Sequence, residues 1–370
     1  MNDQRHDPQP ESPAPPLPLF VAYPRLAASL PRLVLGTFPT PVSSMRRLGA
    51  VVGLADLFLK DDGPSSEFYG GNKVRKLEFL LAAALGRGFR EVLTVGYAGS
   101  NHATATAVHA ERVGMRSISM LLPQPGAAYL RSNLLLSLAA GAELHEYRSP
   151  LVLAAGVLLE MLRHTLRHAR PPFFIPPGGS SALGTVGFVN AAFELAEQVK
   201  AGVAPIPDRV YVAFGSMGSV VGLALGFAAL GWPTRVVAVR VVDERYADRR
   251  GTVALWRRVD SLLRRSDAGF PATAYSDDRV EIRDEFRGDG YACFSPEGER
   301  AVALAAQSEG LKLDGTYTAK TLACLIADAE SGHLAGRRVL FWNTCNSVDV
   351  SRRVAGIDPA RLPRSLQNYF

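Results

Sequence analysis

Short apolar runs alternate with longer segments of helical periodicity between about residue 57 and residue 240. The apolar runs predict β-strands at residues 55–60, 91–95, 117–122, 143–147, 173–175, 209–214 and 235–242. The longer segments predict helices at residues 76–85, 101–113, 129–140, 151–170, 184–199 and 220–230. Strands that alternate with helices at this spacing are typical of parallel sheets covered by helices on both faces. We therefore predict an α/β fold, with the strands in one large sheet or in two smaller ones.

The start of the chain has a different pattern. Six prolines fall within the first twenty residues, and no apolar periodicity accompanies them. We expect residues 1–19 to form a disordered, proline-rich tail, since such a segment buries little apolar surface. The segment is polar and contains acidic residues, so it resembles neither a signal peptide nor a transit peptide. The composition becomes that of a globular protein from Phe20 onward.

Composition narrows the class of protein. The chain has 370 residues, which at about 150 residues per domain suggests two or three domains. Hydrophobic residues make up 47% and charged residues 21%, which excludes a disordered, collagenous or disulfide-scaffold protein. No apolar run approaches the roughly 18 residues of a membrane helix, so we expect no membrane association. The three cysteines show no paired spacing, and we therefore expect reduced thiols and a cytoplasmic protein.

The basic residues are mostly arginine. The formal net charge is +6, but the 35 arginines are scattered and no nucleic-acid-binding motif is visible, so we expect no nucleic-acid partner. Three of the six lysines, Lys60, Lys73 and Lys76, fall within seventeen residues. An amine can lose its proton and attack a carbonyl carbon, which a guanidinium does not do. The lysine cluster is therefore a candidate for covalent chemistry.

Four loops rich in glycine and small polar residues follow predicted strands or precede predicted helices, at residues 69–78, 96–102, 176–181 and 214–219. Ligands of open α/β sheets bind beyond the carboxyl ends of the strands, where such loops lie. The last loop leads directly into an apolar helix, whose N-terminus favours an anion such as a phosphate. Turns of this kind are also common as structural elements, and the second loop could simply cap a helix.

Lys73 and Lys76 lie three residues apart, on one face if the segment is helical. Two neighbouring ammonium groups repel, and this lowers the pKa of a lysine toward its nucleophilic form. The alternative is a solvated basic turn in which Arg75 and Glu78 are surface partners.

Together the four loops resemble the pyridoxal-phosphate enzymes that include D-cysteine desulfhydrase and 1-aminocyclopropane-1-carboxylate deaminase. The most specific match is Gly70-Gly71-Asn72-Lys73-Val74-Arg75-Lys76-Leu77-Glu78. The resemblance implies that Lys73 forms the Schiff base with pyridoxal 5′-phosphate and that Lys76 reaches its phosphate. It also implies a tryptophan-synthase-β-like fold, with two open, twisted, mostly parallel sheets and the cofactor between the domains.

Further site residues follow from the same resemblance. Asn101 would contact the phenolic oxygen of the cofactor, with Ser100 and His102 near the substrate. The phosphate cradle would be Gly215, Ser216, Met217, Gly218 and Ser219. Tyr291 and Tyr317 would line the active site, and Thr318 would meet the pyridine nitrogen. The resemblance further implies a large domain of residues 20–75 and 186–370, a small domain of residues 76–185, and a homodimer.

The family members that open the cyclopropane ring carry a glutamate where this chain has Thr318. A hydroxyl does not keep the ring nitrogen protonated, so we predict β-elimination on a small amino acid, giving a 2-oxo acid and ammonia. The family's Thr-Gly-Gly is replaced by Thr344-Cys345-Asn346, which leaves the substrate open. The alternatives are 1-aminocyclopropane-1-carboxylate deamination, β-replacement, and a non-enzymatic phosphometabolite-binding protein.

His164 and His168 have the i, i+4 spacing that metals use. Neighbouring arginines would repel a cation, so we predict a solvated helix face and no metal.

Overall fold

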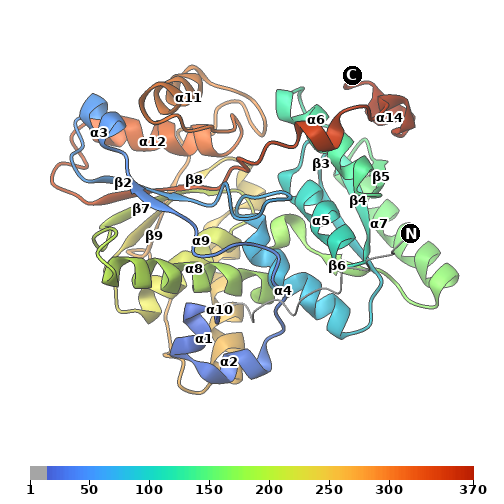
Figure 1. The fold of residues 1–370 in the computed structure, drawn as a ribbon, viewed down its shortest axis with the longest axis horizontal. Coiled ribbons are helices and arrows are strands. Elements are labelled where there is room, and N and C mark those ends of the chain that lie inside the picture. Colours follow the sequence, from blue (N-terminus) through green and yellow to red (C-terminus); the bar gives the residue numbers. More distant parts are fainter. Residues whose placement is uncertain (1–14) are drawn as a thin grey trace, which may run out of the picture.

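The computed structural model describes residues 15–370, which form two sheets wrapped by helices (Figure 1). The larger sheet has the strand order β1-β2-β10-β7-β8-β9 and the smaller one β5-β4-β3-β6. The strands are β1 (Val42–Ser44), β2 (Leu57–Asp61), β3 (Glu91–Tyr97), β4 (Arg116–Leu122), β5 (Glu143–Glu146), β6 (Phe173–Ile175), β7 (Arg209–Phe214), β8 (Arg235–Arg240), β9 (Val280–Arg283) and β10 (Val339–Asn343). Only β1 and β2 pair antiparallel among these strands. The α/β fold with two mostly parallel sheets is confirmed.

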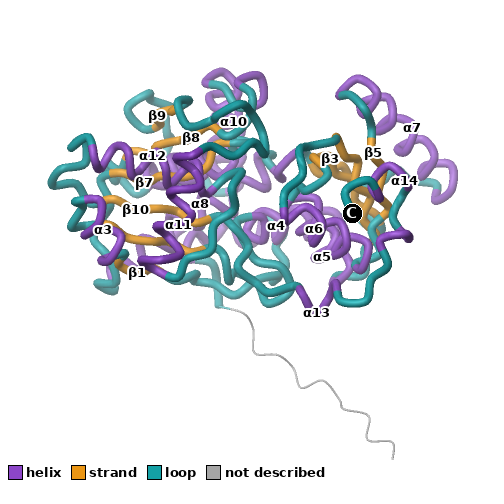
Figure 2. Tube along the Cα trace, turned by 90° about the horizontal axis from the view of Figure 1, so that it is seen from above, coloured by secondary structure: helices purple, strands orange, loops and turns teal. Residues whose placement is uncertain are grey.

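Helices cover both faces of the larger sheet, as Figure 1 shows. The α-helices are α1 (Pro18–Ala22), α2 (Pro24–Ser29), α3 (Arg46–Val52), α4 (Lys73–Gly86), α5 (Asn101–Arg112), α6 (Ala128–Ala139), α7 (Pro150–His168), α8 (Ala182–Lys200), α9 (Gly218–Ala229), α10 (Arg249–Ser266), α11 (Pro296–Glu309), α12 (Thr318–Glu330), α13 (Ser351–Val354) and α14 (Arg364–Gln367). One buried cluster joins α8, α9 and α10 to the sheet, and a second joins α3, α11 and α12 to its other face. Seen from above, the two sheets lie apart, with α4 between them (Figure 2). No helix of residues 15–370 is long and apolar enough to cross a membrane.

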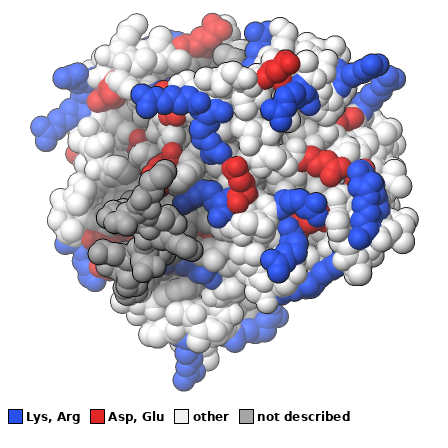
Figure 3. Space-filling view, turned by 45° about the vertical axis from the view of Figure 1, so that its right-hand side comes forward, with Lys and Arg blue, Asp and Glu red and all other residues white. Residues whose placement is uncertain are grey.

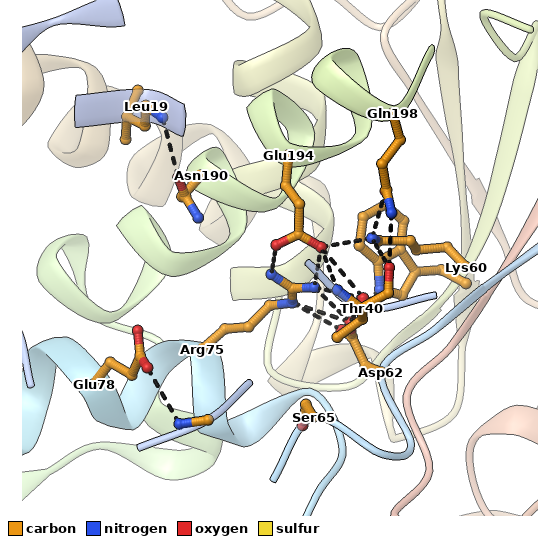
Figure 4. Close-up of polar contacts among 12 residues, drawn as sticks. Leu19, Thr40, Lys60, Asp62, Ser65, Arg75, Glu78, Asn190, Glu194 and Gln198 are labelled. Atoms are coloured by element: carbon orange, nitrogen blue, oxygen red, sulfur yellow. Dashed lines mark hydrogen bonds and ion pairs between the residues drawn. The ribbon is translucent and has the colours of Figure 1, made fainter. Parts of the chain in front are cut away.

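The disordered tail predicted for residues 1–19 includes residues that belong to the folded body. Helix α1 begins at Pro18, and Leu17 and Leu19 are buried against the body of the protein. The backbone N–H of Leu19 donates to the Asn190 side chain on α8 at 3.1 Å (Figure 4). Residues 17–19 therefore belong to the folded body, because apolar side chains between the prolines find a core to pack on. Residues 1–14 lie outside the described residues.

The C-terminal residues pack on the smaller sheet and not on the larger one. Leu362 and Leu366 belong to the buried cluster of the smaller sheet, beside Leu121 and Leu134. In Figure 1 the C-terminus lies near α6 and β5. Leu362 and Leu366 thus pack with the smaller sheet, although they fall in the predicted large domain of residues 186–370. The boundaries at residues 75 and 185 stay a prediction.

Arg75 and Glu78 are buried on α4, so the solvated-turn alternative is wrong. Arg75 donates to Asp62 and Glu194, each at 2.8 Å, and so joins α4 to the end of β2 and to α8 (Figure 4). Lys60 donates to the same Glu194 and to the carbonyl oxygen of Thr40. Burial alone would raise the pKa of Glu194, but the two cations outweigh it and lower that pKa to about 2. This cluster anchors the first turns of α4.

The two histidines of α7 do not share a solvated face as predicted. Of the two, His164 is buried and His168 is exposed.

On the face shown in Figure 3, basic and acidic side chains are interspersed and form no continuous basic surface.

Candidate active site

A cavity of about 410 Å³ opens between the two sheets, at the carboxyl ends of their strands. Its wall includes the following residues: Lys73, Tyr97, Ser100, Asn101, His102, Gly215, Ser216, Met217, Ser219, Tyr291, Asp314, Tyr317 and Thr344. Tyr97 ends β3 of the smaller sheet, whereas Gly215 and Thr344 follow β7 and β10 of the larger one. The structure therefore brings most of the predicted site residues together in one place.

Lys73 is the first residue of α4, and its side chain faces this cavity. Burial lowers the pKa of Lys73 to about 8, although the nearby Asp314 carboxylate opposes the shift. The Lys73 amine makes no hydrogen bond or ion pair within residues 15–370. Near neutral pH roughly a tenth of this amine is thus unprotonated and free to attack a carbonyl carbon.

Lys76 lies one turn further along α4, just behind the cavity wall. Its ammonium donates to the carbonyl oxygen of Gly178 at 3.1 Å and to Ser180 Oγ at 3.0 Å. Burial and the neighbouring Lys73 lower the pKa of Lys76 well below its usual value. Within residues 15–370 no carboxylate pairs with it. A buried cation without a counterion favours an anionic ligand.

The loop after β7 faces Lys76 at the N-terminus of α9. A Cβ atom on Gly218 would lie 2.7 Å from Lys76 Nζ, so a larger residue there would force the lysine ammonium to shift. The preceding Met217 has a φ of 67°, a left-handed conformation that costs a non-glycine residue about 1–3 kcal/mol. Ser216 and Ser180 are joined by a 2.9 Å hydrogen bond. Small hydroxyl residues, a lysine and a helix N-terminus together form a cradle that suits a phosphate.

Asn101 is held with its donor group available. Its carbonyl oxygen Oδ1 accepts from Tyr69 at 3.0 Å and from Asn133 at 2.8 Å. Its Nδ2 group is thereby left to donate into the cavity. Ser100, the N-cap of α5, accepts from the backbone N–H of Ala103.

His102 lies against the same part of the wall, where its Nε2 contacts Thr94 Oγ1 at 3.1 Å. Burial and the two lysines hold the pKa of His102 well below its usual range, so the ring is neutral at pH 7.

Tyr291 and Tyr317 form a pair, with 2.7 Å between their hydroxyl oxygens. The ring of Tyr97 stacks on Tyr291, with 4.3 Å between ring centroids. Burial raises the pKa values of both paired tyrosines above the usual range, so they remain protonated. The pair therefore presents hydroxyl donors to the cavity that Lys73 also lines.

The structure does not place Thr318 in the cavity. Its hydroxyl donates to the Asp314 carboxylate at 3.0 Å and accepts from the backbone N–H of Asp314 at 2.9 Å. These bonds form because Thr318 starts α12 and closes the turn that precedes this helix. Thr344 lines the cavity instead. A signal for Thr344 was available, since it follows the apolar strand β10, but that strand itself was missed.

Cys345 and Asn346, which replace the family's two glycines, do not fill the cavity. Asn346 Oδ1 accepts from the backbone N–H of Gly70 at 2.8 Å and so holds the loop that leads to Lys73. The Cys345 thiol is buried, and burial together with Asp314 raises its pKa well above the usual range. Neither side chain is part of the cavity wall.

A family model described as "pyridoxal-phosphate dependent enzyme" matches residues 33–344. The chain belongs to this family. A putative 1-aminocyclopropane-1-carboxylate deaminase of Pyrococcus horikoshii is 33% identical, over 86% of this chain and 93% of that protein. Nocardicin C-9′ epimerase of Nocardia uniformis is 34% identical, over 90% of this chain and 98% of that protein. D-cysteine desulfhydrase of Klebsiella pneumoniae is 34% identical, over 80% and 88% respectively.

Solved structures agree with this membership. The crystal structure of a 1-aminocyclopropane-1-carboxylate deaminase homologue has a TM-score of 0.76 and 29% identity, and it covers 93% of this chain and all of that one. The match confirms the tryptophan-synthase-β-like fold. Pyridoxal phosphate is the cofactor of this family, and the observed residues fit it: Lys76 lacks a counterion, Asn101 offers a donor and Lys73 a free amine.

Proposed function

We propose that this pyridoxal-phosphate enzyme catalyses β-elimination on a small amino acid, in the manner of a D-cysteine desulfhydrase. The observation that carries the proposal is that an amine with a pKa of about 8, Lys73, lines the same cavity as the protonated pair Tyr291 and Tyr317. When bound, the cofactor supplies a carbonyl carbon that amines attack and a ring that accepts electrons. The chain itself supplies a base and an acid.

Each residue of the site has a separate role. Lys73 would hold the cofactor, and its amine would take the proton from the substrate Cα atom. The tyrosine pair donates a proton or a hydrogen bond to the leaving group on Cβ. Lys76 and residues 215–219 hold the phosphate, and Asn101 orients the ring. For cysteine the balanced reaction consumes one water and yields pyruvate, hydrogen sulfide and ammonia.

The carboxylate in the cavity wall argues for elimination over ring opening. Asp314 is the one carboxylate among the described wall residues, and its oxygens accept from the backbone N–H of Tyr317 at 2.6 Å and from Thr318 Oγ1. It is thus committed to the turn before α12. We assign the contact with the pyridine nitrogen to the hydroxyl of Thr344. A hydroxyl does not keep that nitrogen protonated, and opening a cyclopropane needs the stronger electron acceptor.

Release of 2-oxo acid from a panel of amino acids tests this function. We expect turnover of D-cysteine or β-chloroalanine and little 2-oxobutanoate from 1-aminocyclopropane-1-carboxylate. Rapid turnover of the cyclopropane substrate, with none of the β-substituted amino acids consumed, would refute elimination.

Epimerisation is a second candidate. A base and a proton donor that line one cavity also suit removal of the Cα proton and its return to the opposite face. The likeness to an epimerase over 90% of this chain favours the same chemistry. In D₂O an epimerase incorporates deuterium at Cα and inverts the substrate without releasing 2-oxo acid, whereas elimination releases it.

We also propose that the protein is a cytoplasmic homodimer, as the family resemblance implies. Helix α7 supports an interface between two copies, because it exposes a set of leucines to solvent: Leu151, Leu158, Leu159, Leu162 and Leu166. Apolar surfaces of this kind mark contacts between proteins. Sedimentation velocity of the wild type tests the dimer, and Leu158→Glu with Leu162→Glu tests the interface. Val203→Glu, at an exposed position after α8, is the matched control.

A further inference from the structure

Three histidines and three glutamates gather at the end of the smaller sheet that is remote from the cavity. Glu91 is the first residue of β3, whose last residue, Tyr97, reaches the cavity wall. Glu143 and His145 are two residues apart on β5 and therefore point to one face of the sheet. Glu160 and His164 are four apart on α7 and share one face of that helix.

His164 is the unusual member of this cluster. Its side chain is only 4% exposed, and its Nδ1 lies 2.8 Å from Glu91 Oε2. Since a carboxylate accepts, Nδ1 carries a hydrogen and donates it to Glu91. Within the described part of the chain, Nε2 is buried and has no hydrogen-bond partner.

Two further carboxylates lie close to Nε2 of His164. Nε2 lies 3.5 Å from Glu143 Oε2 and 3.7 Å from Glu160 Oε2. Both distances are too long for a hydrogen bond, which spans about 2.7–3.2 Å, so a second proton on the ring would not satisfy the contact. A cation held between Nε2 and the two carboxylate oxygens would be attracted by both carboxylates.

The spacing suits a metal ion. Zinc binds histidine nitrogen and carboxylate oxygen at about 2.0–2.2 Å, and a tetrahedral arrangement at these lengths separates the ligand atoms by roughly 3.3–3.6 Å. Glu143, His145 and Glu160 each bring a ligand atom within 4.8 Å of the others. A metal-binding histidine usually donates its other N–H to a carboxylate, as His164 donates to Glu91.

We propose that Glu143, His145, Glu160 and His164 bind one divalent transition-metal ion such as Zn²⁺, and that Glu91 positions His164. The ion joins β5 to α7. The first turn of α7, with Pro150 and Leu153, forms part of the cavity wall, so the bound metal also fixes that wall.

Arg163 competes with the ion. Its Nη1 lies 3.0 Å from Glu143 and 2.8 Å from Glu160, and it partly neutralises the two carboxylates. One third of its side chain is exposed, so the guanidinium can move into solvent when a metal binds. Removing it with Arg163→Gln should therefore tighten metal binding.

A second set of potential ligands is Glu91, His164 and His168, but there His164 Nδ1 already donates to Glu91. Arg116 lies 2.6 Å from Glu91 Oε1 and 3.2 Å from His168 Nε2. His168 is therefore the matched control for the proposed ligands, because it lies on the same helix, one turn beyond His164.

Zinc titration of the untagged holoenzyme tests the site, after removal of metals with EDTA and in competition with a chromophoric chelator. We expect one zinc per chain. His145→Asn and Glu160→Gln should each weaken binding about tenfold or more, His168→Asn should change it by less than about twofold, and Arg163→Gln should strengthen it. X-ray absorption of the zinc-loaded enzyme should show nitrogen and oxygen ligands without sulfur.

His145 is partly exposed, so His145→Asn should fold, and the unfolding midpoint provides a second readout. Zinc should raise the midpoint of the wild type and leave that of the variant unchanged. The proposal is overturned if the wild type binds no zinc in competition with the chelator, if both ligand variants bind like the wild type, if His168→Asn abolishes binding, or if the ligands include sulfur.

Discussion

Two pairs of buried cations lie near the start of α4, and they differ in what neutralises them. Lys60 and Arg75 are surrounded by Asp62 and Glu194 (Figure 4), whereas Lys73 and Lys76 contact no carboxylate among the described residues. Burial lowers the pKa values of Lys60 and Lys73 alike to about 8. The contacts, and not the pKa values, therefore separate a structural cation from one that awaits a ligand.

The largest effect should follow from removing the unpaired amine that faces the cavity. Lys73→Ala should lower activity by roughly 10²–10⁴-fold or more, because the base and the covalent attachment of the cofactor are both lost. The unfolding midpoint of the apoenzyme should stay close to that of the wild type, since within residues 15–370 the Lys73 amine has no hydrogen bond or ion pair to lose. Steady-state assays and urea unfolding measure the two, with Lys200→Ala, an exposed lysine, as the control.

Disrupting the ion pairs that Lys60 and Arg75 make with Glu194 should instead lower the stability of the fold. Glu194→Gln leaves Lys60 and Arg75 undercompensated and should cost about 3–5 kcal/mol of unfolding free energy. Glu197→Gln removes an exposed carboxylate one turn away on the same helix and should change stability by less than about 1 kcal/mol. Equal unfolding free energies for the two variants would show that the cluster is not structural.

Lys76 tests whether the second unpaired cation holds an anion. Lys76→Gln should weaken cofactor binding by about 10–100-fold, the loss expected for a charge-assisted contact of about 1.5–3 kcal/mol. Equilibrium dialysis against pyridoxal phosphate measures it. Unchanged affinity, together with lost stability, would place Lys76 with Arg75 as a structural cation.

The smallest effects are expected at Thr344 and Thr318, which should affect different properties. Thr344→Val removes a hydroxyl that faces the cavity and should lower the elimination rate by up to about tenfold. Thr318→Val removes one of the hydrogen bonds to the buried Asp314 and should mainly cost about 1–3 kcal/mol of unfolding free energy. The opposite pattern, with the catalytic loss at Thr318, would restore the role that the sequence suggested for it.

The fold was predictable where strands and helices alternate with clear periodicity. All seven predicted strands and all six predicted helices are present with small shifts at their ends. Strands β1, β9 and β10 were missed because they lie outside residues 57–240, where strands and helices alternate clearly. The leucines of the predicted tail were misread because proline-rich composition outweighed two apolar positions.

The site was predictable where residues are adjacent in a loop, and less so where a residue's partner decides its role. Lys73, Asn101 and residues 215–219 come from contiguous motifs that the fold brings to one cavity. Thr318 was misplaced because its bonds to Asp314 depend on the turn before α12, which the sequence pattern does not reveal. The cluster around His164 was overlooked because Glu91 and Glu143 come from strands distant in sequence from His164.

The central claim is that Lys73, the unpaired amine in the cavity, carries the cofactor. Borohydride reduction of the holoenzyme fixes the cofactor to the lysine that holds it, and peptide mapping by mass spectrometry then locates the modified residue. The account predicts a single label on Lys73. A label on Lys76, or on the paired Lys60, would contradict it.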